Sequence, residues 1–270
     1  MRLGIGSYTY AWAIGVPGHM PERPLSALGL LERARALGVG VVQYCDNLPL
    51  LELDAAELEE LIARAGEYGV EIELGARGLS GDNVLGHLAL ARRLKAKFVR
   101  FVVDKDGDEP SPEEALARIQ QFLPEFIEAG VLFAIENHDR FPASVLQWMI
   151  EALGDRHSGI CLDTVNSMGA LETPRDVVPS LAPYTVNLHV KDFRIGRIPG
   201  MMGFEVTGCA AGQGMLDIPW VLDHLRGAGR DVNAILELWT PAAGSLEATI
   251  AQEHRWAESS VAYMRTLIPD

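Results

Sequence analysis

The chain of 270 residues has few cysteines and no long hydrophobic run, and each shortage excludes a class of protein. Its three cysteines, Cys45, Cys161 and Cys209, are widely spaced and odd in number. A disulfide framework is therefore not expected, and reduced thiols predict a cytoplasmic protein. No apolar stretch approaches the roughly 20 residues that span a bilayer, so no membrane partner is expected. The N-terminus lacks the apolar core of a signal peptide and is interpreted as a first strand.

Basic residues are also few relative to acidic ones. The chain has 23 lysine and arginine residues against 37 aspartate and glutamate residues, which gives a net charge of −14. Because nonspecific nucleic-acid binding depends on a basic surface, this balance predicts no nucleic-acid partner. Much of the acidity lies in expected surface helices such as residues 52–60, where it serves solubility.

Strand-like and helix-like segments alternate along the whole chain. Strands are expected at residues 3–8, 41–45, 72–76 and 98–103, and four more end near residues 136, 163, 189 and 237. Helices are expected at residues 24–37, 54–68, 83–95, 111–129, 142–153, 174–181, 218–226 and 245–267, with a long glycine-rich loop after the seventh strand. Strict alternation implies a parallel sheet, and eight units of this length match a closed barrel better than an open sheet. The predicted fold class is therefore α/β, with residues 1–270 forming a single (β/α)8 TIM barrel domain.

Each of the last four expected strands ends on one side chain that binds metals well. These side chains are Glu136, Asp163, His189 and Glu237. A lone acid at a strand end is more often a helix cap or an ion-pair partner, and a lone histidine is more often a hydrogen-bonded core residue. Four in successive strands, all at the C-terminal end of one barrel, favour a common metal site. Mixed carboxylate and imidazole ligation suits one divalent cation, with Mn²⁺ expected first and Mg²⁺, Co²⁺ or Zn²⁺ as alternatives.

Cationic side chains are expected around this centre. Lys191 lies on the same strand face as His189 and could bind a carboxylate, a phosphate or an oxyanion, or could pair with a neighbouring acid. Arg77 and Arg100, near the ends of the third and fourth strands, could hold an anionic group or pair with acids such as Asp104.

Three further side chains are candidates for substrate contact. His138 could hydrogen-bond a substrate hydroxyl or support Glu136. Trp12, in the aromatic loop of residues 8–18, and Trp239 could form an apolar wall, or they could simply pack between barrel loops. The segment 208–214 has three glycines but no lysine, and we do not interpret it as a phosphate-binding loop.

The order and spacing of several motifs resemble a known family, the xylose-isomerase-like barrels of sugar isomerases, epimerases and related lyases. The motifs are Ile135-Glu136-Asn137-His138, Leu162-Asp163-Thr164, His189-Val190-Lys191-Asp192, Gly212-Gln213-Gly214-Met215-Leu216-Asp217 and Leu236-Glu237. By this resemblance the four strand-end side chains would be the metal ligands, and Glu136 and Glu237 could double as catalytic acid and base. Barrels of this kind are often dimers or tetramers, which suggests a homodimer or homotetramer here.

One position departs from the family pattern. Many sugar epimerases of this family have a substrate-contacting histidine three residues after the aspartate ligand, and this chain has Asn166 there. The change counts against simple ketose 3-epimerisation, and also against the family's apurinic endonucleases, which need additional histidines for a three-metal cluster. Asn166 stays a candidate substrate-binding residue.

Two enzyme classes and one non-enzymatic class remain open. The first is a metal-dependent isomerase or epimerase that acts on a small sugar or keto-polyol through an enediolate. The alternative is a metal-dependent lyase, a decarboxylase or dehydratase of an oxidised sugar or keto sugar acid, similar to 3-oxo-isoapionate decarboxylases or inosose dehydratases. The third is a barrel that keeps the ligands only as a sugar-binding or structural site. Both enzyme classes predict a small carbohydrate or sugar acid as the partner. The non-enzymatic class predicts either a bound sugar or no ligand beyond the metal.

Overall fold

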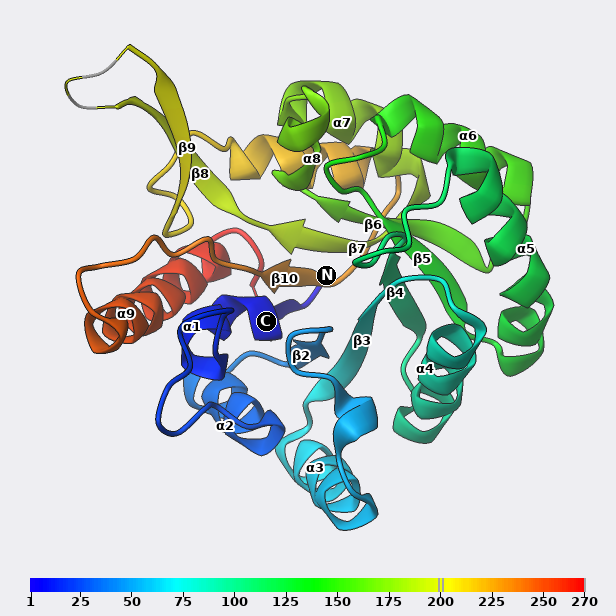
Figure 1. Ribbon diagram of the computed structural model, residues 1–270, viewed down its shortest axis with the longest axis horizontal. Helices are drawn as coiled ribbons and strands as arrows, with labels where there is room; N and C mark the ends of the chain where they lie inside the picture. The colour runs from blue at the N-terminus through cyan, green and yellow to red at the C-terminus, as the bar shows by residue number, and fades with distance from the viewer. Residues whose placement is uncertain (199, 201, 270) are drawn as a thin grey trace.

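Parallel strands close into a barrel of eight across the residues that the structure describes, 1–198, 200 and 202–269 of a computed structural model (Figure 1). The strands neighbour one another in the order β1, β10, β7, β6, β5, β4, β3, β2. Their bounds are β1 (Leu3–Gly6), β2 (Val41–Tyr44), β3 (Glu71–Arg77), β4 (Phe98–Val102), β5 (Leu132–Glu136), β6 (Ser158–Asp163), β7 (Thr185–Val190) and β10 (Ala234–Leu236). The predicted α/β class and (β/α)8 TIM barrel are confirmed.

Helices follow the strands and form the outer ring of the barrel in Figure 1. They are α2 (Ala27–Leu37), α3 (Ala55–Tyr68), α4 (Gly81–Leu94), α5 (Pro112–Ala129), α6 (Ala143–Leu153), α7 (Pro174–Leu181), α8 (Ile218–Gly227) and α9 (Leu246–Arg265). Capping chemistry sets several of these bounds. The Ser111 side chain accepts a hydrogen bond from the Glu114 backbone N–H at the start of α5, and Gly130 ends that helix in the left-handed conformation. Within the described residues, none of the helices is both long and apolar enough to cross a membrane.

The barrel wall separates an apolar layer from a polar interior. Residues that point outward from the strands pack under the helices, as in the stack of Phe101 on Phe133, whose ring centroids are 4.5 Å apart. Inside the barrel, a small apolar cluster of Phe98, Ala134 and Cys161 is buried. Above it, two positions further along the same strands, stand charged side chains such as Arg100 and Glu136. The strand alternation thus directs polar groups to the C-terminal mouth of the barrel.

Two segments differ from the sequence-based expectation. The glycine-rich loop expected after the seventh strand contains an antiparallel hairpin, β8 (Asp192–Arg197) paired with β9 (Phe204–Cys209), which projects at the upper left of Figure 1. Its glycines, Gly196 and Gly208, obscure the alternation of larger residues that a strand normally shows. The expected loop of residues 8–18 also contains a short helix, α1 (Ala11–Ile14).

Candidate active site

The four strand-end side chains meet at the C-terminal mouth of the barrel. Nδ1 of His189 lies 3.6 Å from Glu136 Oε1, 3.8 Å from Asp163 Oδ2 and 3.4 Å from Glu237 Oε1. The strand register explains the convergence, because Asp163 on β6 is the direct partner of His189 on β7. All four residues are buried, so three carboxylates surround one imidazole in a site with little access to bulk water. The structure brings together the complete set that the sequence singled out.

Atoms of this cluster lack the partners that buried polar groups normally have. Among the described residues, Glu136 Oε2 and Asp163 Oδ2 each lie 2.8 Å from one cationic nitrogen, of Arg100 and Lys191, and His189 Nδ1 and Glu237 Oε1 are buried with no hydrogen-bond partner. Each such atom costs about 1–3 kcal/mol unless something else satisfies it. The other oxygen of Asp163 accepts hydrogen bonds of 2.8 Å from the backbone N–H groups of Val165 and Asn166, which fixes the carboxylate. A donor set of three carboxylates and one imidazole fits a divalent cation.

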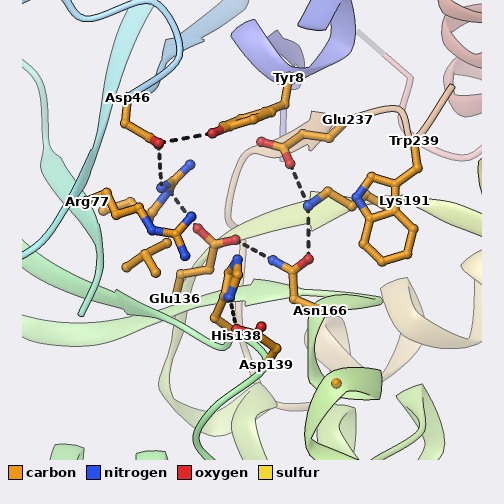
Figure 2. Close-up of a pocket in the computed structure, with 13 residues that line it drawn as sticks. Tyr8, Asp46, Arg77, Glu136, His138, Asp139, Asn166, Lys191, Glu237 and Trp239 are labelled. Atoms are coloured by element: carbon orange, nitrogen blue, oxygen red, sulfur yellow. Dashed lines mark hydrogen bonds and ion pairs between the residues drawn. The ribbon is translucent and has the colours of Figure 1, made fainter. Parts of the chain in front are cut away.

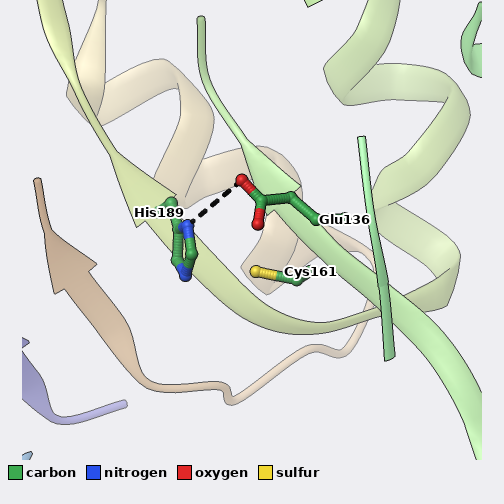
Figure 3. Close-up of side chains that lie close together, drawn as sticks. All are labelled: Glu136, Cys161 and His189. Atoms are coloured by element: carbon green, nitrogen blue, oxygen red, sulfur yellow. Dashed lines mark ion pairs between the residues drawn. The ribbon is translucent and has the colours of Figure 1, made fainter. Parts of the chain in front are cut away.

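A second grouping of potential ligands includes a cysteine. Ligand atoms of Glu136, Cys161 and His189 also lie within 4.8 Å of one another (Figure 3). Burial raises the pKa of the Cys161 thiol, and the Glu136 charge raises it further, so the thiol keeps its proton. That thiol donates weakly to Asn187 Oδ1 over 3.5 Å. Because thiolates favour softer metals, the oxygen and nitrogen donors above Cys161 are the better set for Mn²⁺ or Mg²⁺.

Two cations compensate part of the acidic charge. Arg100 Nε lies 2.8 Å from Glu136 Oε2, and Lys191 Nζ lies 2.8 Å from Asp163 Oδ2 and 2.9 Å from Glu237 Oε2. Burial alone would raise the pKa of Glu136, but the Arg100 and His189 charges hold it well below its usual range. Burial alone would lower the pKa of Lys191, but Asp163 and Glu237 hold it above its usual range. Glu136 is thus an ionised carboxylate, and Lys191 is an ammonium that carries a proton.

Asn166 connects the two sides of the cluster, as Figure 2 shows. Its Nδ2 donates to Glu136 Oε1 over 2.8 Å, and its Oδ1 accepts from Lys191 Nζ over 3.2 Å. The asparagine therefore orients both the carboxylate of Glu136 and the ammonium of Lys191.

An open cavity of about 380 Å³ lies directly over the cluster. This size suits a small polar molecule rather than a polymer. The lining residues come from most of the barrel strands and are predominantly charged or aromatic. They are Tyr8, Asp46, Arg77, Arg100, Val102, Glu136, His138, Asp139, Asn166, Gly169, Lys191, Glu237 and Trp239.

Most of the other residues that the sequence analysis proposed for substrate contact line this cavity. Arg77 does so while it pairs with Asp104, whose Oδ2 lies 3.2 Å from Arg77 Nη2. His138 pairs with the adjacent Asp139 carboxylate instead of supporting Glu136. The Trp239 ring faces the Lys191 ammonium, which lies 5.6 Å from the ring centroid.

Trp12 is not among the side chains that line the cavity. Its indole N–H donates to the Thr240 carbonyl over 2.7 Å, and its ring packs near His19. These contacts turn the ring away from the mouth of the barrel. The structure therefore places Trp12 in loop packing, the alternative that the sequence left open.

Tyr8 and Asp46 line the cavity but were not selected from the sequence. The Tyr8 hydroxyl donates to Asp46 Oδ2 over 3.0 Å, and Asp46 Oδ1 lies 3.8 Å from Arg100 Nη1. Asp46 comes two residues after the end of β2, which is the position that carries function in this fold. The place of Asp46 just after a strand was the only signal of function in the sequence, and a single acid at a strand end is more often a structural residue.

The glycine motif near residue 212 is structural. The Asp192 carboxylate accepts hydrogen bonds from the backbone N–H groups of Gly212, Gly214 and Leu216, over 2.9, 2.8 and 3.1 Å. A Cβ on Gly214 would lie 2.1 Å from Asp192 Oδ1. The motif thus links the chain after β9 to Asp192, the residue that follows Lys191.

Comparison with known proteins places these features in context. A family model described as xylose isomerase-like TIM barrel matches residues 31–267. The 3-oxo-isoapionate decarboxylase of Pectobacterium atrosepticum is 35% identical over 269 residues, covering 100% of this chain and 97% of the relative. A D-psicose 3-epimerase solved in the presence of D-fructose shares the fold with a TM-score of 0.73 and 15% identity, covering 100% of both chains. A xylose isomerase-like TIM barrel protein from Mycobacterium smegmatis, solved in complex with magnesium, has a TM-score of 0.68 and 14% identity, covering 97% of both chains.

Proposed function

This chain belongs to the family of xylose isomerase-like TIM barrels, and from that premise we propose that it is a divalent-metal-dependent decarboxylase of a 3-oxo sugar acid. The relative at 35% identity along the whole chain bears the name of such a decarboxylase, and it motivates the choice among the reactions of the family. The observation that carries the proposal is a cationic wall, defined as Arg77, Arg100 and Lys191, which lines the cavity beside the carboxylate cluster.

Each member of the cationic wall is paired with a carboxylate, Arg77 with Asp104, Arg100 with Glu136, and Lys191 with Asp163 and Glu237. A divalent cation at the cluster would neutralise part of that negative charge, and the wall would then suit an acidic substrate. Arg100 forms an ion pair with Glu136 and is almost fully buried, with only 2% of its side chain exposed. Arg77 has 32% of its side chain exposed and is the member with room to accept an incoming carboxylate. We assign carboxylate binding to Arg77, whose planar guanidinium can receive two oxygens.

Decarboxylation of a 3-oxo acid has a simple electron balance. The bond between the carboxylate carbon and C2 breaks, and CO₂ leaves. The electron pair of that bond becomes the C2–C3 double bond of an enolate, with the negative charge on the 3-oxo oxygen. One proton must then be added at C2 to give the ketone product.

A divalent cation held by Glu136, Asp163, His189 and Glu237 would stabilise the negative charge that develops on the 3-oxo oxygen. Mn²⁺ is our first proposal and Mg²⁺ our second, since the donor atoms are carboxylate oxygens and one imidazole nitrogen.

Lys191 is the group that we assign to deliver the proton to C2. It is an ammonium, it lines the cavity, and it is oriented by Glu237 and Asn166. Glu136 is ionised and can only accept a proton, so it does not suit this step. After the transfer, the neutral amine would regain its proton from water that enters the open cavity.

The direct test is CO₂ release. The Mn²⁺-loaded protein is incubated with 3-oxo-isoapionate and, separately, with a neutral ketose, and both CO₂ and solvent-deuterium uptake are followed. The proposal expects stoichiometric CO₂ from the acid and one deuterium at C2 of the product. Absence of CO₂ from this and other 3-oxo sugar acids would remove the proposal.

A second candidate is the isomerase or epimerase that the sequence analysis placed first. The observation in its favour is the pair of glutamates, since Glu136 and Glu237 both approach His189 and could act as base and acid. Deuterium incorporation into a ketose without loss of carbon, abolished by Glu136→Gln, would support it over the decarboxylase.

A further inference from the structure

A layer of amide side chains lies beneath the cluster of Glu136, Asp163, His189 and Glu237, and it contacts His189. His189 Nε2 is 2.7 Å from Gln43 Oε1, and both side chains are fully buried. Gln43 is on β2 and His189 on β7, so the contact crosses the interior of the barrel. If the Gln43 atom is its carbonyl oxygen, it can only accept, and the donor in this contact is then the Nε2–H group of His189.

The orientation of the Gln43 amide follows from a chain of contacts with an unambiguous end. Asn187 Nδ2 lies 3.3 Å from the backbone carbonyl of Asn233, which can only accept. Asn187 must therefore present Oδ1 on its other side, where Gln43 Nε2 donates to it over 3.1 Å. Gln43 Oε1 is then left facing His189, and the Cys45 thiol approaches the same oxygen over 3.4 Å. The network assigns the amide without reference to the histidine.

Glu73, on β3, accepts hydrogen bonds from the side chains of the same layer. Its Oε2 accepts from Gln43 Nε2 over 3.2 Å and from Asn187 Nδ2 over 3.1 Å, and its Oε1 accepts from Asn233 Nδ2 over 2.8 Å. Three amides from three parts of the chain thus converge on one buried side chain. This convergence leaves Gln43 little freedom to rotate.

The opposite face of the imidazole agrees with this assignment. His189 Nδ1 points toward three carboxylates at 3.4–3.8 Å and has no hydrogen-bond partner among the described residues. When Nε2 donates to Gln43, the lone pair of the neutral imidazole is on Nδ1, on the side where a cation would meet the three carboxylates.

We infer that Gln43, held by Asn187 and Glu73, is a positioning residue that fixes His189 in the Nε2–H tautomer and so presents the Nδ1 lone pair to the metal. The inference rests on the proposed metal site and is independent of the proposed reaction. When the group that hydrogen-bonds the non-ligating nitrogen of a ligand histidine is removed, metal affinity typically falls 10–100-fold.

The first experiment needs no metal. Nitrogen-15 NMR of histidine-labelled, metal-free protein, recorded at a pH high enough for His189 to be neutral, reports which ring nitrogen carries the proton, with His189→Gln used to assign the signal. We expect a protonated Nε2 and an unprotonated Nδ1. A proton on Nδ1 of neutral His189 would overturn the inference, whether or not the enzyme releases CO₂.

The second experiment compares two variants of β2. Gln43→Met keeps the side-chain length and removes the acceptor, and we expect Mn²⁺ affinity, measured by calorimetry, to fall at least about tenfold. Tyr44→Phe is the matched control, because it removes a buried hydrogen bond of 2.9 Å to the Ala27 carbonyl on the outer side of the same strand. The control should bind Mn²⁺ as the unmodified protein does. Unchanged affinity in folded Gln43→Met would contradict the inference, and if that variant does not fold, the NMR experiment still decides.

Discussion

Lys191 and Glu237 form an ion pair inside the mouth of the barrel, with Nζ 2.9 Å from Oε2 and both side chains buried. The pair puts a proton-bearing ammonium directly beside an expected metal ligand. A cation and a proton donor in contact with one carboxylate are what loss of CO₂ followed by protonation requires.

Replacing Lys191 by methionine should lower the rate of CO₂ release without weakening substrate binding to the same extent. We expect Lys191→Met to lower kcat for CO₂ release about 10²–10³-fold, since a positioned general acid contributes on this scale. Arg77→Met is the companion variant, and it should mainly raise KM because it removes the carboxylate partner. Thermal unfolding with Mn²⁺ present checks that both variants are folded. A Lys191→Met protein with undiminished kcat would exclude Lys191 as the proton donor.

Asn166 should control the charge state of Glu136. Asn166→Asp replaces a donor 2.8 Å from Glu136 Oε1 with a carboxylate oxygen. The added negative charge should raise the pKa of the Glu136 carboxyl, so the acidic limb of the pH–rate profile should move to higher pH. Asn166→Ser loses the hydrogen bond without adding charge, and it should lower the rate with a smaller displacement of that limb. Identical profiles for the two variants would contradict this role.

Gly214 should tolerate no side chain. The added Cβ of Gly214→Ala would lie 2.1 Å from Asp192 Oδ1 and 2.4 Å from the Phe193 carbonyl oxygen. We expect a loss of at least about 2 kcal/mol in the free energy of unfolding, because the Asp192 hydrogen bonds must be displaced. Gly66→Ala is the control, since its Cβ would meet nothing within 4 Å on exposed helix α3, and it should gain about 0.5–1 kcal/mol. Urea unfolding measures both, and equal stability of the two variants would refute the argument.

Glu253 should make the stability of the fold depend on pH. Burial raises the pKa of Glu253 to about 7, although the backbone N–H groups of Trp12 and Ala13 donate to it and act in the opposite direction. Below its ordinary value of 4.5 the group is protonated in both states, and between that value and about 7 only the unfolded chain ionises. The free energy of unfolding should therefore fall by up to about 1.4 kcal/mol per pH unit across this window and then level off.

The measurement is urea unfolding from pH 4 to pH 8 of the unmodified protein and of Glu253→Gln, which stays neutral in both states. The stability difference between them should grow with pH over the window and be constant above it. Glu258→Gln, exposed on the same helix, is the matched control. A difference between the Glu253→Gln protein and the unmodified protein that does not vary with pH would contradict the prediction.

The barrel and the ligand cluster were accessible from the sequence for a local reason. Each of the four candidate ligands lies at the end of its own strand or one residue from it, so alternation within short segments predicts that Glu136, Asp163 and His189 point inward at one level. The proposed roles of these residues, the homodimer or homotetramer, and the cytoplasmic location stay predictions.

What the sequence could not provide depends on contacts between distant segments. The contact of Gln43 with His189 joins residues 146 positions apart, and no local pattern marks it. The pairing of Arg77 with Asp104 was one of two open alternatives in the sequence, and the fold shows that pairing while Arg77 also lines the cavity. The β8–β9 hairpin was interpreted as a loop because its glycines interrupt the strand pattern.

The central claim is that the four strand-end side chains hold one divalent cation on which decarboxylation depends. Mn²⁺ is titrated into chelator-stripped protein while bound metal and CO₂ release from 3-oxo-isoapionate are measured in the same samples. The account predicts that the rate rises in proportion to bound Mn²⁺, saturates at one ion per chain, and does not rise in His189→Ala. Full activity of the stripped protein, or Mn²⁺ bound at one ion per chain without any CO₂ release, would contradict it.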